Sequence, residues 1–300
     1  PEPAAPGAPV RDESALERDR LCLSRALFPD LAERLDAALA EAQESIPGGV
    51  SRTAGFDARL DAEAAAMFAG AGLAGLAGSA GGARLQQAFA SAGEAVRAFF
   101  PGVGLVLPEP EAFEAAGVDL SRLAGLLAAD PMLVAVPAPH GLGPEAWRAA
   151  FRRAAAAPVG FFSEVDAAGE PQEPLALASE VLREFEALDR MPAEQEPVGR
   201  AWTLRLVPAA QQPAILGLNF AHGGPHVTLP EMLMLQLMRA VEGATPLDGG
   251  DGRSSFTWLA GSLADGRLAA RHVFDAGAIR ITAREVGSQG PHLGARPPIS

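Results

Sequence analysis

The spacing of apolar residues changes near residue 101, and this change constrains the fold more than any other feature. Before it, leucines recur at helical intervals over residues 16–27 and again over 31–39, and another helical segment covers 83–100. After it, short apolar runs bounded by Pro and Gly are typical of buried strands. The pattern therefore predicts an α+β fold that begins with a helical region.

The middle of the chain alternates between short apolar runs and helical segments. Strands are expected at residues 103–107 and 132–136, and helices at 109–116, 119–129 and 144–157. Strand followed by helix is the order of a βαβ unit. Further along, residues 161–165 and 175–177 flank a turn at 166–169, which predicts a hairpin before a helix at 179–190.

The last hundred residues read mainly as strands around one helix. Strands are expected at 202–207 and 215–220, and Thr228 with Glu231 has the spacing of a capping box that opens a helix reaching residue 241. Three β-rich runs at 256–263, 267–274 and 278–285 are joined by Gly-ended turns, as in an antiparallel meander. The chain from 287 to 300 is rich in Pro and Gly and is expected to be irregular. The fold expectation is thus a helical N-terminal region, a mixed sheet with covering helices, and a C-terminal meander.

Composition shifts suggest where the regions begin and end. We expect a disordered tail at 1–12, a helical region at 13–100, an α/β region at 101–191 and an α+β region with the meander at 198–300. The proline-rich segment 192–197 is the expected boundary between the last two.

Composition and charge exclude several classes of function. All 24 basic residues are Arg, so Schiff-base and P-loop lysine chemistry are excluded, and there is no Tyr. The use of Arg without Lys indicates a GC-rich bacterial genome. A net charge of −13 disfavours nucleic acids and acidic membranes. The uncharged stretch 64–83 is mostly Ala and Gly, so stable membrane insertion is not expected. A lone cysteine, Cys22, permits no internal disulfide and fits a cytoplasmic protein.

The densest candidate site is the run from Asn219 to His226, directly after an apolar run. His222 and His226 are candidate catalytic residues, and Gly223 and Gly224 are candidate ligand-binding residues. A metal bound by the two histidines is the weaker alternative, because the Gly-Gly-Pro between them cannot form a helix. His222-Gly223-Gly224 also resembles the oxyanion loop of the lipase branch of the α/β-hydrolases, where backbone N–H groups face the oxyanion. That resemblance covers three residues and assigns no nucleophile.

Two other histidines share the local pattern of His226. His140 and His292 also follow a proline in Gly-rich segments, so the three loops are candidates to converge on one site. Arg271, Arg280 and Arg284 on the expected meander are candidates to hold an anionic ligand bidentately.

The catalytic inventory is sparse, whereas apolar segments that could meet partners are prominent. The helix around residues 232–241 is apolar on nearly all sides and rich in Met, which indicates burial or an adaptable binding surface. Trp202 and Trp258 are expected in the core. The leading hypothesis is a non-catalytic interaction or assembly protein with a protein partner or self-association and no cofactor. The alternative is an enzyme or small-ligand or metal binder that uses the His-Gly loops.

Overall fold

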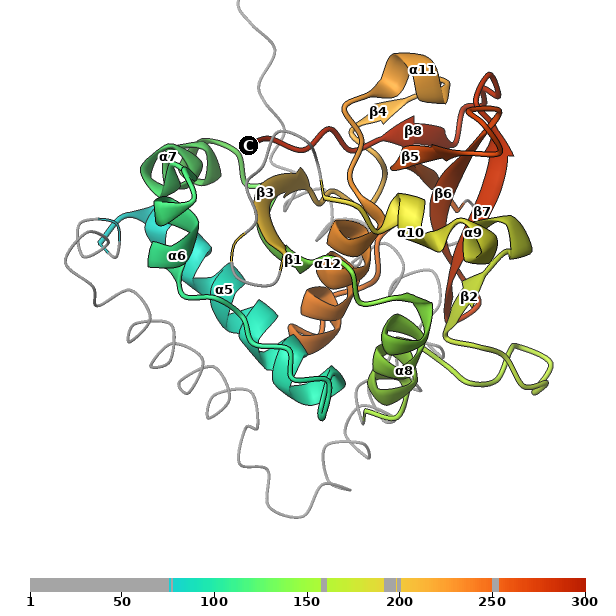
Figure 1. Ribbon diagram of the computed structural model, residues 1–300, viewed down its shortest axis with the longest axis horizontal. Helices are drawn as coiled ribbons and strands as arrows, with labels where there is room; N and C mark the ends of the chain where they lie inside the picture. The colour runs from blue at the N-terminus through green and yellow to red at the C-terminus, as the bar shows by residue number, and fades with distance from the viewer. Residues whose placement is uncertain (1–75, 77, 158–160, 192–197, 199–200, 250–253) are drawn as a thin grey trace, which may run out of the picture. The chain divides into compact units, whose positions relative to one another are not determined.

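The computed structural model describes residues 76, 78–157, 161–191, 198, 201–249 and 254–300 (Figure 1). The expected tail, the helices expected before residue 76, Cys22 and most of the 64–83 stretch lie outside the described residues. The helices are α5 (Ala80–Phe99), α6 (Pro110–Ala115), α7 (Leu120–Ala129), α8 (Pro144–Ala155), α9 (Ser179–Arg183), α10 (Phe185–Leu188), α11 (Phe220–Gly223) and α12 (Leu229–Val241). The strands are β1 (Leu133–Pro139), β2 (Leu175–Leu177), β3 (Trp202–Pro208), β4 (Ile215–Leu216), β5 (Phe256–Leu263), β6 (Leu268–Asp275), β7 (Ala278–Glu285) and β8 (Leu293–Ala295). This combination confirms the α+β class.

The helices before β1 follow their capping residues closely. Ser79 begins α5 by accepting a hydrogen bond from the N–H of Gly82, and Asp119 does the same for α7. The two helices pack so closely that a Cβ on Gly81 would overlap the carbonyl of Ala124. An alanine-rich sequence thus builds this part of the core through close backbone approach.

A two-stranded antiparallel sheet, β1–β3, packs against α5 and α12. The strand expected at 103–107 is wrong, because this segment forms turns in which Gly102 and Gly104 have φ of +79° and +68°, and Val106 is 75 % exposed. The expected βαβ unit is therefore also wrong. Strand β1 pairs with β3 instead, and the pairing is antiparallel.

The second sheet has six strands within the described residues, in the order β2-β7-β6-β5-β8-β4. Antiparallel pairing of β5, β6 and β7 confirms the expected meander. The hairpin expected between residues 161–165 and 175–177 is wrong. Strand β2 pairs in parallel with β7 instead, and Val165 forms only a bridge to Pro171. The chain after residue 287 is less irregular than expected, because β8 joins this sheet beside β5.

Two expected elements are shorter than the sequence pattern indicated. The strand expected at 215–220 is limited to β4, because Gly217 turns the chain with φ of +81° and Asn219 caps α11. The helix expected at 179–190 is divided into α9 and α10 at Glu184. The carboxylate of Glu184 accepts a hydrogen bond from the N–H of Ala264, which ties this break to the end of β5.

Helix α12 is the centre of the core and contacts both sheets through β1 and β5. The capping box of Thr228 and Glu231 is present, as predicted. The methionines of α12 are buried, and so are Trp202 and Trp258, which confirms the core expectation for all of them. No helix in the described part of the chain is long and apolar enough to span a membrane. The division into regions at 100 and 191 remains a prediction.

Candidate functional site

The four candidate histidines lie in two kinds of environment. His140 and His226 are buried, with 5 % and 9 % of their surface exposed, whereas His222 and His292 are exposed. His140 follows β1, and its N–H donates to the carbonyl of Ala201. Burial thus separates His140 and His226 from the other two, and convergence of the three loops on one site remains a prediction.

The imidazole of His222 contacts the N-terminal cap of its own helix, α11. Its Nδ1 lies 2.7 Å from Oδ1 of Asn219, the residue that caps α11. Both His222 and Gly223 lie in α11, and Gly224 follows it, so these residues do not form a loop directly after a strand. Within the described residues, no group of three His, Cys, Asp or Glu side chains is arranged to hold a metal.

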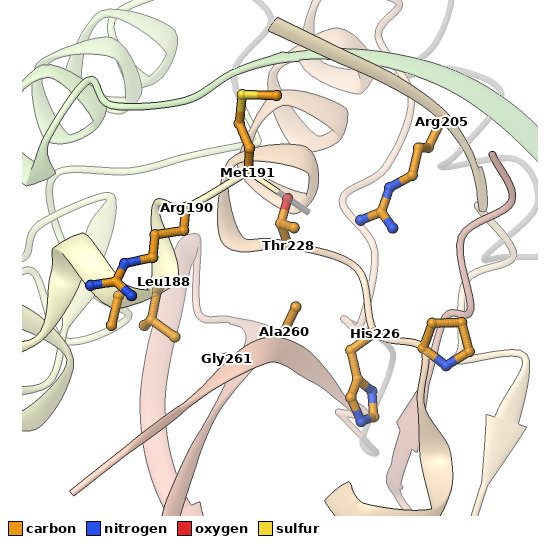
Figure 2. A pocket seen from close by; sticks show the side chains of 10 residues that line it. Leu188, Arg190, Met191, Arg205, His226, Thr228, Ala260 and Gly261 are labelled. Atoms are coloured by element: carbon orange, nitrogen blue, oxygen red, sulfur yellow. The ribbon is translucent and has the colours of Figure 1, made fainter. Parts of the chain in front are cut away.

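His226 lines a cavity of about 320 Å³ between the end of α10, β3, β5 and the segment before α12 (Figure 2). A cavity of this size lies in the range of small-molecule sites. The described residues that line it include no Asp or Glu: Ala187, Leu188, Arg190, Met191, Arg205, Pro225, His226, Thr228, Ala260 and Gly261.

Arg205 is held in this cavity by a buried ion pair with Glu231. Its Nε lies 2.7 Å from Oε1 and its Nη2 lies 2.6 Å from Oε2, a bidentate arrangement. Glu231 also accepts the N–H of Thr228 as part of the capping box, so the first turn of α12 fixes the carboxylate. Nη1 of Arg205 has no partner among the described residues, and its two N–H groups remain available to the cavity.

Arg190 lies on the opposite side of the cavity from Arg205, with Thr228 between them (Figure 2). It is exposed and makes no ion pair with any described residue. The preceding residue, Asp189, is buried and accepts hydrogen bonds from the N–H groups of Gly141 and Gly143. Burial raises the pKa of Asp189 despite these bonds. This contact anchors the chain that carries Arg190 to the loop after β1.

His226 is a neutral imidazole with a defined tautomer. Its Nε2 lies 2.8 Å from the carbonyl oxygen of Phe220, so Nε2 carries the proton. Burial lowers the pKa of His226, and the hydrogen bond to Phe220 opposes this lowering only in part. The imidazole also stacks on the ring of Phe220, with ring centroids 4.5 Å apart. Nδ1 then carries a lone pair, and it is buried without a hydrogen-bond partner among the described residues.

His140 contacts the same strand, β3, that carries Arg205. Its Nε2 is 3.0 Å from Oγ1 of Thr203, two residues before Arg205 on β3. Burial lowers the pKa of His140 to about 4, with Glu231 raising it and Arg205 lowering it by smaller amounts. His140 and His226 are therefore both uncharged near neutral pH. The Arg205–Glu231 pair influences the pKa of His140, whereas His226 shares only the cavity lining with Arg205.

The three candidate arginines of the meander share one sheet face but do not line the cavity. The register pairs Arg271 with Thr282 across β6 and β7 and places Arg280 and Arg284 on the same face. Arg271 donates to Thr282 and lies over the ring of Phe256, 4.1 Å from its centroid. Arg280 lies 3.5 Å from Asp275, and Arg284 donates to Ser288. Local groups thus hold each of these side chains.

Away from the cavity, a buried polar cluster joins Asp248, His272 and Arg296, none of which is exposed. Asp248 lies 2.7 Å from Nδ1 of His272 and 2.6 Å from Nη2 of Arg296. The Arg296 guanidinium also donates to three backbone carbonyls and to Thr257. Such complete satisfaction and burial indicate a structural network.

Comparison of the chain with protein-family models, curated proteins and solved structures gives no match. The geometry of the cavity therefore carries the functional argument. Sequence reasoning missed Arg190 and Arg205. One signal for Arg205 was present, because an arginine in the apolar run 202–207 requires a buried partner. Arg190 follows a helix in a polar segment, where nothing in the pattern distinguishes it from a solvated charge.

Proposed function

We propose that the protein binds a small organic anion in the cavity between β3, α10 and the segment before α12. One observation carries the proposal: in a chain with net charge −13, the described residues that line this cavity include two arginines and no acidic side chain. The available hydrogen-bond donors are those of Arg190 and Nη1 of Arg205. Charged donors in a partly desolvated site favour an anionic acceptor.

The cavity supports binding better than catalysis. The hydroxyl oxygen of Thr228 accepts a hydrogen bond from the N–H of Glu231 as part of the helix cap, and His226 has no hydroxyl, thiol or carboxylate partner among the described residues. An activated nucleophile requires such a pairing. The proposal is therefore a ligand-binding role, and it assigns the histidines no catalytic step.

An interaction or assembly role remains a prediction. The Met-rich helix that suggested it is explained by the fold itself, since α12 is buried in the core. A protein partner, self-association and a cytoplasmic location also remain predictions.

Titration calorimetry with small carboxylates, phosphate esters and sulfate tests the proposal, each compared with an uncharged analogue at constant ionic strength. At least one anion should bind saturably, and Arg190→Ala should weaken its binding at least about tenfold, because a charge-assisted hydrogen bond contributes roughly 1.5–3 kcal/mol. The matched control is Arg183→Ala, an exposed arginine of α9 that does not line the cavity. Failure of every anion to bind, or equal effects of the two variants, would contradict the proposal.

A further inference from the structure

The charges of the described residues that line the cavity, together with Glu231, add up to one uncompensated cation. Arg205 is neutralised by the bidentate contact with Glu231, while Arg190 makes no ion pair with the described residues. His226 adds no charge near neutral pH because burial lowers its pKa. A ligand with a single negative charge would neutralise this cation, and its anionic group would pair with Arg190.

The opposite end of the cavity favours an uncharged acceptor. A second carboxylate at Nη1 of Arg205 would lie beside the buried carboxylate of Glu231, and two buried acids sharing one guanidinium repel each other. A carbonyl oxygen avoids this cost and has two lone pairs. Those lone pairs match Nη1–H of Arg205 and the hydroxyl proton of Thr228, whose oxygen already accepts from Glu231.

The rest of the described lining is mainly apolar and includes Leu188, Met191, Pro225 and Ala260. Figure 2 shows Leu188 on the Arg190 side and Ala260 between the two ends. The cavity volume of about 320 Å³ corresponds to about ten water-sized volumes of roughly 30 Å³ each. The ligand is therefore short and has an aliphatic middle.

Building on the proposed function, we infer that the ligand is a short monocarboxylate with a neutral carbonyl at its far end. Its carboxylate pairs with Arg190, its aliphatic middle contacts the apolar walls, and its carbonyl oxygen accepts from Arg205 and Thr228. Within this class, 5-oxohexanoate is a suitable probe, with 4-oxopentanoate and 6-oxoheptanoate to match the length of the cavity.

Three analogues of the probe separate the parts of this inference in titration calorimetry with the full chain. Hexanoate lacks the carbonyl, glutarate replaces it with a second carboxylate, and 2-hexanone lacks the carboxylate. The best oxo acid should bind at least tenfold more tightly than each of the analogues. Binding of hexanoate or glutarate as tight as that of every oxo acid would overturn the ligand class while leaving anion binding intact. If no anion binds at all, both proposals fail.

The variant Arg190→Ala tests the orientation of the ligand. It should weaken the oxo acid and hexanoate by the same factor, because the carbonyl contacts the other end of the cavity. The preference for the oxo acid over hexanoate should therefore persist in this variant, and Arg183→Ala should change neither affinity. Loss of the preference in Arg190→Ala would show that the carbonyl lies at Arg190, which overturns the inference.

Discussion

At the scale of single residues, the pair of Arg205 and Glu231 connects the stability of the protein to its cavity. The two side chains are 6 % and 0 % exposed, so Glu231 has no water as an alternative partner and Arg205 meets solvent only through the cavity. Removal of one partner leaves the other charge buried and uncompensated, which costs far more than the pair itself contributes. The donors that serve a ligand are consequently held in place by a contact that the fold cannot easily lose.

We predict that Arg205→Met lowers the free energy of unfolding by about 3–5 kcal/mol, because Glu231 then remains as an isolated buried carboxylate. The double variant Arg205→Met/Glu231→Gln should recover most of this loss, since Gln can still complete the capping box. Urea denaturation at pH 7 measures both.

A matched control comes from Arg152, whose Nε and Nη2 contact Glu173 with the same bidentate geometry at the surface. Arg152→Met should cost less than about 1 kcal/mol, because water solvates the remaining carboxylate. A similar cost for Arg152→Met and Arg205→Met would contradict the role assigned to burial.

Sequence reasoning reached one part of this cluster and not the other. Spacing alone identified Thr228 and Glu231 as a capping box, because helix capping is local. The pairing of Glu231 with Arg205 joins residues 26 positions apart and depends on how α12 packs against β3. Similarly, the pattern of His after Pro in Gly-rich loops identified His140 and His226 but could not distinguish them from the exposed His292.

At the scale of elements, helices were predicted well and strand partners poorly. Caps and apolar periodicity lie within each helix, so α5, α7, α8 and α12 follow from the sequence. Pairing of β2 with β7 joins segments about a hundred residues apart, and no local signal specifies it. The apolar run at 103–107 failed as a strand because its glycines turn the chain away from any partner.

The contact of α5 with α7 gives a prediction at this scale. Gly81→Ala should lower the free energy of unfolding by about 1–3 kcal/mol, because the new methyl group overlaps the carbonyl of Ala124 and the helices must separate.

Gly125, on α7 itself, is the matched control because a Cβ there meets no atom within 4 Å. Gly125→Ala should stabilise the protein by about 0.5–1 kcal/mol through its helix propensity. Thermal unfolding of the two variants measures the contrast, and a destabilisation by Gly125→Ala equal to that by Gly81→Ala would rule out the close-packing explanation.

At the scale of the whole molecule, the cluster of Asp248, His272 and Arg296 joins distant parts of the chain. It connects the segment after α12, strand β6 and the chain after β8. Burial alone raises the pKa of Asp248, but Arg296 and His272 outweigh it and the net pKa is lowered. The Pro and Gly content of the C-terminal segment predicted an irregular chain. The role of Arg296 could not be predicted, because its partners are distant in the sequence.

Titration of buried histidines predicts how the stability of the whole protein depends on pH. The pKa of His140 is lowered from 6.5 to about 4 by burial, so between these pH values the unfolded chain binds a proton that the folded protein does not. Stability from this group is present above pH 6.5 and is lost as the pH falls toward 4, by about 3 kcal/mol in total. His226 contributes in the same direction, because burial also lowers its pKa.

His140→Gln should therefore reduce, without abolishing, the loss of stability between pH 6.5 and 4, because Gln cannot take up the proton and His226 still can. Urea denaturation at several pH values measures the slope in the parent and the variant. His222→Gln, the same substitution at an exposed histidine, is the matched control. Removal of a group with a depressed pKa must flatten the pH dependence that the group causes. If the free energy of unfolding depends on pH equally in His140→Gln and the parent, the buried imidazole does not link folding to protonation.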